Sequence, residues 1–111
     1  MKFPTDLLRE MTYEDKITVE IGDWGFTEPF VIESVEKEVY DERRWSTVYR
    51  QILAVTRPDD ETTRYFETDY SEGATELQDE TPYENDGDEI LLDEVFPVEV
   101  KVIQYRRKPN A

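Results

Sequence analysis

Carboxylate side chains are the most concentrated chemical groups of this sequence, and they gather between residues 73 and 89. This segment, called the acidic stretch below, has no basic residue and seven acidic ones: Glu76, Asp79, Glu80, Glu84, Asp86, Asp88 and Glu89. Closely spaced carboxylates can act as general acids and bases, as oxygen ligands of a hard cation, or as an anionic surface for a basic partner. The rest of the sequence has to distinguish these three chemistries.

Catalysis finds little support in the residue types. The chain contains no His and no Cys, which excludes Ser–His and Cys–His nucleophilic pairs. Two carboxylates at a fixed separation would suit glycoside hydrolysis. With 28 acidic residues among 111, however, such pairs arise by chance. The sequence therefore predicts a protein that is not an enzyme, with no catalytic residue and no cofactor.

A cation site is the second chemistry to consider. Glu84, Asp86, Asp88 and Glu89 lie next to Gly87 and offer the oxygen ligands that Ca²⁺ prefers. The spacing does not fit an EF-hand, because the first ligand would then fall on Pro82. We assign no metal site from the sequence, and keep a small calcium-binding domain as a third hypothesis.

The net charge favours the third chemistry. The chain carries −15, with −4 on residues 1–58, −15 on residues 59–99 and +4 on residues 100–111. Such asymmetry bears on partners and solubility. Regularly placed carboxylates can imitate the DNA backbone for a protein that binds phosphate through Lys and Arg. Direct nucleic-acid binding is not expected, because the surplus charge outweighs the basic run Arg106-Arg107-Lys108 and repels phosphate.

The predicted partner-binding surface consists of the seven carboxylates of the acidic stretch together with Tyr83. Tyr83 stands between Pro82 and Glu84, where we expect an exposed aromatic side chain that anchors a partner. The alternative is a solvated acidic face that only keeps the protein soluble. The sequence leaves these two readings open.

The elements around the acidic stretch follow from hydropathy periods. A short helix is expected over residues 6–11, with Thr5 as its N-cap. Alternating apolar residues predict strands over 16–21, 30–40, 45–56, 62–70 and 95–105. A helix over 33–42 is an alternative, but its β-branched residues favour a strand. Apolar residues on both faces of 45–56 place that strand centrally.

The expected fold is α+β, in a single domain of residues 1–111. It has a mainly antiparallel five-stranded sheet, one short N-terminal helix and a long acidic loop before the last strand. No apolar run approaches the roughly 20 residues of a membrane helix, and the N-terminus lacks the apolar core of a signal peptide. Together with the absence of cysteine, this predicts a cytoplasmic protein without a membrane partner.

Three runs carry a resemblance to known proteins: WSTVY (45–49), YSEGATELQDE (70–80) and VFPVEV (95–100). They are similar to small acidic proteins of unknown function that bacteriophages and prophages encode. The resemblance covers roughly the last two thirds of the chain. It implies a host-cell setting, in which small acidic phage proteins often block host enzymes.

A second resemblance rests on the run VIESV (31–35). It is similar to the acidic–Ser–aliphatic strand motif of uracil-DNA glycosylase inhibitors. That resemblance implies a secondary partner contact at Glu33 and Ser34.

The leading hypothesis is a phage-type acidic protein that inhibits a basic, DNA-handling or defence protein of the host by charge mimicry of DNA. The alternative is a phage accessory or structural protein that assembles with itself through a sheet edge, with an acidic face that confers solubility. A homo-oligomer is therefore possible, and one that is insensitive to salt would favour this alternative.

Overall fold

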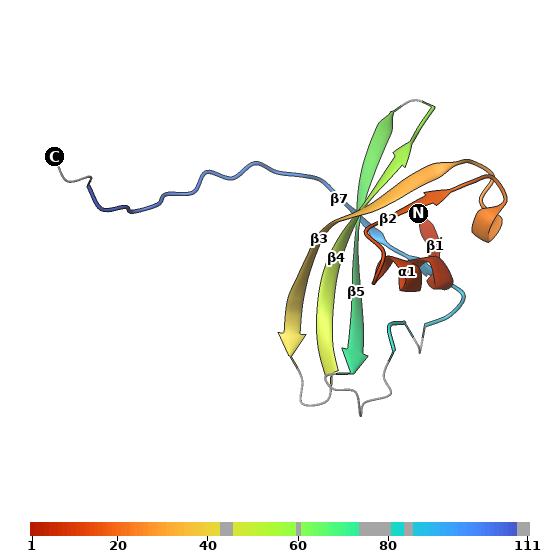
Figure 1. Ribbon diagram of the computed structural model, residues 1–111, viewed down its shortest axis with the longest axis horizontal. Coiled ribbons are helices and arrows are strands. Elements are labelled where there is room, and N and C mark those ends of the chain that lie inside the picture. The colour runs from red at the N-terminus through yellow and green to blue at the C-terminus, as the bar shows by residue number, and fades with distance from the viewer. Residues whose placement is uncertain (43–45, 60, 74–80, 84–85, 109–111) are drawn as a thin grey trace.

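The computed structural model describes residues 1–42, 46–59, 61–73, 81–83 and 86–108 (Figure 1). Within them lie seven strands, one α-helix and one short 3₁₀ turn. In chain order these are β1 (Lys2–Pro4), α1 (Thr5–Met11), β2 (Lys16–Val19), the turn Asp23–Gly25, β3 (Phe30–Glu42), β4 (Ser46–Arg57), β5 (Thr62–Gly73), β6 (Glu89–Leu91) and β7 (Asp93–Val95).

Five strands form one antiparallel sheet in the order β2-β3-β4-β5-β7. Strands β2 to β5 are neighbours in both sequence and space, so they form a meander. The α+β class, the short helix and the five-stranded sheet are confirmed as well. A second sheet, in which β1 pairs with β6, was not predicted.

Strand β4 lies at the centre of the sheet and buries side chains on both faces. Leu53 and Val55 belong to the main core on the side of α1, here called the core face. Ile52 and Ala54 are buried on the opposite, outer face. This agrees with the alternation that predicted a central strand.

Strand β3 is a strand throughout, and not a helix, although two register shifts interrupt its pairing with β4. Strand β2 pairs with β3 only from Phe30 to Glu33. Among the described residues, β3 therefore has no neighbouring strand on that side from Val35 to Tyr40. This part of β3, residues 35–40, is called the free β3 edge below.

Helix α1 and the β1–β6 pair cover the core face. Leu7, Leu8 and Met11 recur at helical spacing and are fully or almost fully buried. Phe3 of β1 meets Phe66 of β5 edge-to-face, with ring centroids 5.2 Å apart. The N-terminal residues thus fix the β6 segment to the sheet.

The expected role of Thr5 is wrong. Thr5 is the first residue of α1, Pro4 occupies the N-cap position, and no side chain caps the helix. The Thr5 hydroxyl instead donates a hydrogen bond to the carbonyl oxygen of Gly87. A tertiary contact with Gly87, which belongs to the acidic stretch, therefore takes the hydroxyl that the local pattern assigned to the helix N-cap.

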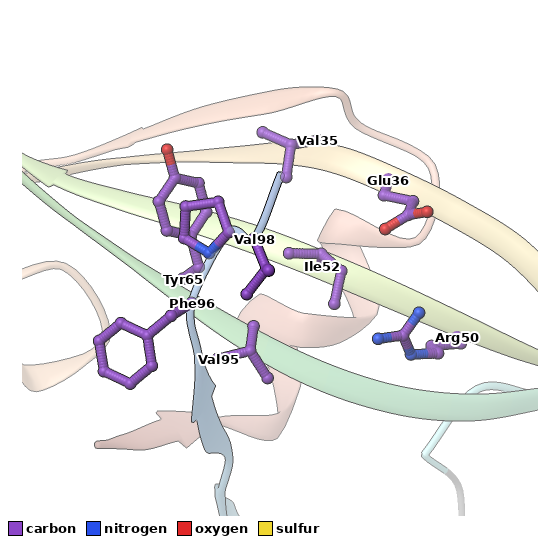
Figure 2. Close-up of a pocket in the computed structure, with 9 residues that line it drawn as sticks. Val35, Glu36, Arg50, Ile52, Tyr65, Val95, Phe96 and Val98 are labelled. Carbon is purple, nitrogen blue, oxygen red and sulfur yellow. The ribbon is translucent and has the colours of Figure 1, made fainter. Parts of the chain in front are cut away.

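The prediction of a last strand over 95–105 is also wrong. The last strand, β7, ends at Val95, where it pairs with Tyr65. An antiparallel continuation would soon run past the start of β5 at Thr62, and Pro97 has no N–H to donate. The chain instead crosses the outer face of the sheet, where Phe96 and Val98 line a groove with Tyr65 (Figure 2).

Residues 96–108, called the C-terminal segment below, run on as extended chain outside the strands (Figure 1). The radius of gyration is 17.7 Å, compared with about 13 Å for a compact domain of this length. The segment therefore stands away from the folded body.

Candidate functional site

A pocket of about 280 Å³ at the edge of β5 brings together four carboxylates, and we call it the acidic pocket. The residues that line it are Glu67, Thr68, Asp69, Tyr83, Asp86, Ile90, Leu91, Leu92 and Asp93. The carboxylates come from three segments that are separated in sequence. Only the fold therefore assembles this site.

Strand geometry places three of the carboxylates. Glu67 and Asp69 are two residues apart on β5 and share the outer face. Asp93 on β7 lies directly opposite Glu67 in the antiparallel pairing. Like charges opposite one another in a sheet repel. The pairing thus concentrates negative charge at this point of the sheet edge.

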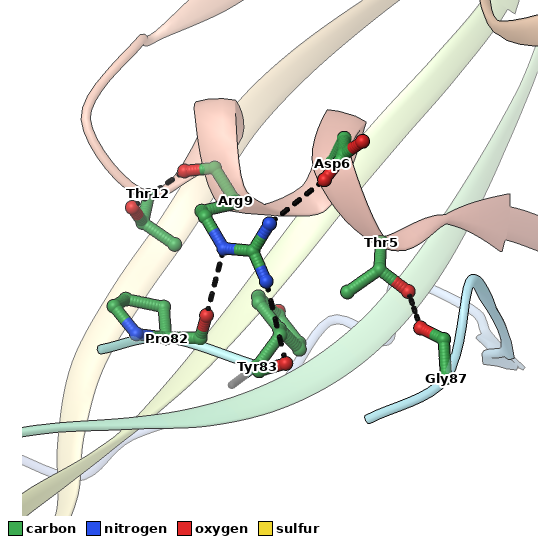
Figure 3. Close-up of polar contacts among 7 residues, drawn as sticks. All are labelled: Thr5, Asp6, Arg9, Thr12, Pro82, Tyr83 and Gly87. Carbon is green, nitrogen blue, oxygen red and sulfur yellow. Dashed lines mark hydrogen bonds and ion pairs between the residues drawn. The ribbon is translucent and has the colours of Figure 1, made fainter. Parts of the chain in front are cut away.

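Helix α1 binds the chain on both sides of the fourth carboxylate, Asp86, and Figure 3 shows its contacts with Pro82, Tyr83 and Gly87. Arg9 donates from Nε to the carbonyl oxygen of Pro82 at 3.1 Å and from Nη2 to that of Tyr83 at 3.4 Å. Its Nη1 pairs with Asp6 at 2.8 Å. The Asp86 amide in turn donates to the Tyr83 carbonyl oxygen at 3.2 Å. Asp86 therefore follows a segment that is fixed to the helix.

The expectation that Tyr83 is an exposed anchor is wrong. Its side chain is only 5% exposed and belongs to the main core. Its hydroxyl shares a 2.7 Å hydrogen bond with Thr68, and its ring lies 5.8 Å from that of Tyr70. Burial raises the pKa of the phenol above its usual value. The ring is buried, although carboxylates flank it in the sequence, because removing its apolar surface from water stabilises the fold.

The backbone of Tyr83 adopts a left-handed conformation, with φ of 61°. This region costs a residue with a Cβ roughly 1–2 kcal/mol. The buried ring and the two Arg9 contacts oppose that cost. Tyr83 is thus a structural anchor of the chain beside the pocket.

The charge in the acidic pocket is only partly compensated. Arg50 Nε contacts Glu67 Oε1 at 2.7 Å, and its Nη1 reaches Glu38 at 3.1 Å. Among the described residues, Asp69, Asp86 and Asp93 form no ion pair. Asp69 is exposed as a residue, yet partial desolvation raises the pKa of its carboxyl, the nearby Glu67 charge raises it further, and Arg50 lowers it. The site is therefore short of positive charge.

The other residues of the predicted surface have different positions. Glu76, Asp79, Glu80 and Glu84 lie outside the described residues. Asp86, Asp88 and Glu89 are exposed, and of these only Asp86 lines the acidic pocket. The Asp88 carbonyl oxygen accepts from the Thr5 amide at 2.8 Å, and Glu89 pairs with Pro4 in the small sheet.

The secondary pair Glu33 and Ser34 does not form one surface. The two residues are adjacent on β3, so their side chains point to opposite faces. The Ser34 hydroxyl accepts a 2.9 Å hydrogen bond from Gln51, which also donates to the carbonyl oxygen of Met11. Glu33 is exposed on the outer face. Ser34 is thus used inside the fold.

Sequence reasoning missed Glu67, Asp69 and Asp93 as site residues. Both Glu67 and Asp69 fall within the strand predicted over 62–70. The signal that was available is two acids at alternate positions of one strand, which must share a face. The pairing of Asp93 with Glu67 had no local signal, because it depends on where β7 joins the sheet.

The described part of the chain lacks two features: a metal-binding cluster and a membrane-spanning helix. It contains no group of three or more Asp and Glu residues arranged to hold a metal ion. It also contains no helix that is long and apolar enough to cross a membrane.

Comparisons with known proteins give no relative: no family model, no curated protein and no solved structure matches this chain.

Proposed function

We propose that the protein is a non-enzymatic binding protein whose acidic pocket receives a Lys or Arg side chain of a basic partner. The observation that supports this is the convergence of four carboxylates, three of which have no ion pair among the described residues. As in the sequence hypothesis, the partner is a DNA-handling or defence protein of a bacterial host. The protein inhibits it in the cytoplasm by occupying its phosphate-binding residues.

The physical argument concerns unbalanced charge. Asp69 is partly desolvated beside Glu67, so an incoming cation would relieve repulsion as well as gain attraction. Hydrogen bonds between a guanidinium and carboxylates are among the stronger polar contacts in proteins. Strand pairing and the Arg9 contacts hold the pocket before binding, which reduces the entropy lost on association.

A pull-down with matched variants tests the proposal. Tagged protein is incubated with bacterial lysate at low and at high salt, and retained proteins are identified by mass spectrometry. The pocket variant carries Asp69→Asn, Asp86→Asn and Asp93→Asn. The control loses the same charge at exposed positions away from the pocket, through Glu14→Gln, Glu20→Gln and Asp59→Asn.

We expect one basic protein to be retained at low salt, weakened at high salt, kept by the control and lost by the pocket variant. Equal retention by both variants would show that net charge, not the acidic pocket, binds the partner. Retention of nothing but the protein itself would favour the self-assembling alternative.

The pH dependence of that binding gives a second readout. The raised pKa of Asp69 means that this carboxyl takes up its proton at a higher pH than an ordinary Asp. Only the ionised form attracts a cation, so affinity should fall as pH falls through that pKa. In the variant Asp69→Asn, the affinity for the partner should lack this part of the pH dependence. Titration calorimetry of the variant with the retained protein measures this affinity.

A further inference from the structure

The C-terminal segment exposes an unusual run of apolar side chains. Their exposed fractions lie between 70 and 95%, and they are Phe96, Val98, Val100, Val102, Ile103 and Tyr105. Four of these occupy alternate positions, so an extended chain presents them on one face. Soluble proteins rarely leave such a contiguous apolar surface without a partner. The segment thus has the sequence of a strand, but no strand in the described part of the chain lies beside it.

The free edge of β3 is the complementary feature. Between Val35 and Tyr40, β3 pairs with β4 on one side only, as far as the described residues go. Val35, Val39 and Tyr40 are each about half or more exposed there. Unpaired backbone groups beside exposed apolar side chains form a template for an added strand.

The C-terminal segment and the free β3 edge carry opposite net charges, and the segment is long enough to pair along that edge. The free stretch of β3, residues 35–40, carries a net charge of −1, and the C-terminal segment carries +3. At about 3.3 Å per residue, the seven residues 99–105 span roughly 23 Å, which covers the six residues 35–40 of β3. The segment is therefore long enough and oppositely charged.

The segment is poorly placed to reach the β3 edge of its own chain. Val98 already lies in the outer-face groove with Val35 (Figure 2), so the chain would have to turn sharply after it. Residues 98–105 contain no Gly, Pro, Asn or Asp, the residues that commonly make such turns. The chain instead runs straight away from the sheet (Figure 1).

We propose that the C-terminal segment adds a strand to the free β3 edge of a second copy of this protein. The observations behind this are independent of the acidic pocket. In the sheet order β2-β3-β4-β5-β7, the β3 edge and the β5–β7 edge lie on opposite sides. Association through β3 leaves the acidic pocket open.

Disulfide cross-linking tests the contact directly, because the chain has no cysteine of its own. Two single-cysteine proteins, Val39→Cys and Val100→Cys, are mixed and oxidised. The control mixture replaces the first with Ile21→Cys, which is also an exposed apolar position but lies outside β3. We expect the Val39–Val100 hybrid to form at least about tenfold faster than the control hybrid, a difference equivalent to about 1.4 kcal/mol.

Sedimentation velocity of the full chain tests the energetics. The variant Val100→Ser with Val102→Ser removes apolar surface from the proposed strand. The matched control, Glu99→Ser with Lys101→Ser, changes the intervening positions and leaves the net charge unchanged. We expect a concentration-dependent dimer whose association constant falls at least about tenfold in the valine variant, and less than about threefold in the control.

Three results would overturn the proposal. One is a monomer at every concentration at which the protein stays soluble. Another is equal cross-linking of Val100→Cys to positions 39 and 21. The third is a disulfide formed within one chain by the double variant Val39→Cys/Val100→Cys in a monomeric sample, since it would place the segment on its own β3 edge.

Discussion

Residues 81–95 and residues 96–108 both follow the long strands of the sheet, yet the fold treats them in opposite ways. In the described part of the first segment, Tyr83 is buried, Arg9 and Thr5 bind its backbone, and β6 and β7 each join a sheet. In the second segment, apolar side chains stand in solvent. The sequence indicated the reverse, an open acidic loop followed by a secured strand.

Local sequence pattern therefore does not decide which segment packs against the rest of the fold. The alternating valines of 98–102 have high β propensity, but a strand needs an edge to pair with, and an antiparallel continuation of β7 would run past the start of β5 at Thr62. Polar residues around Tyr83 suggested a solvated loop. Helix α1 donates hydrogen bonds from the Arg9 guanidinium and the Thr5 hydroxyl to backbone carbonyl groups on either side of this tyrosine. Because these carbonyl groups have partners, the segment can pack against the core.

The largest loss of stability is expected for Tyr83→Ala, which tests whether residues 81–83 are anchored in the core. Removing a buried aromatic ring should lower the free energy of unfolding by about 3–5 kcal/mol. Tyr83→Phe keeps the ring and loses the Thr68 hydrogen bond, so it should cost about 1–2 kcal/mol. Urea denaturation measures both losses.

Tyr13→Ala, at an exposed position, is the control, and its free energy of unfolding should stay within about 0.5 kcal/mol of the original. A cost for Tyr83→Ala no larger than that of the control would mean that residues 81–83 are not anchored.

Arg9→Met should have an intermediate effect. It removes the hydrogen bonds to the Pro82 and Tyr83 carbonyl groups and should cost about 1–2 kcal/mol. Amide exchange in residues 86–92 should also become faster. The control is Arg57→Met, the same change at an exposed ion pair with Glu28, which should cost at most about 1 kcal/mol. Unchanged exchange in Arg9→Met would contradict the role of the helix in holding this segment.

The smallest effect is expected in the C-terminal segment. Val100→Ser with Val102→Ser should change the free energy of unfolding of the monomer by less than about 0.5 kcal/mol, because both side chains are exposed. Thermal or urea unfolding at low protein concentration separates this from self-association. Val19→Ser, at a fully buried position, is the contrast and should cost well above 1 kcal/mol. A comparable loss in the valine variant would show that the segment packs within its own chain.

The sequence alone predicts the α+β class and the central place of β4, because hydropathy period is a local property. It also located the surplus of negative charge. The tertiary structure alone decided that Tyr83 enters the core, that Thr5 bonds to Gly87 and that Asp93 meets Glu67. Each of these depends on contacts between residues far apart in the chain, and local patterns carry no record of which distant edge, ring or carbonyl group will be available.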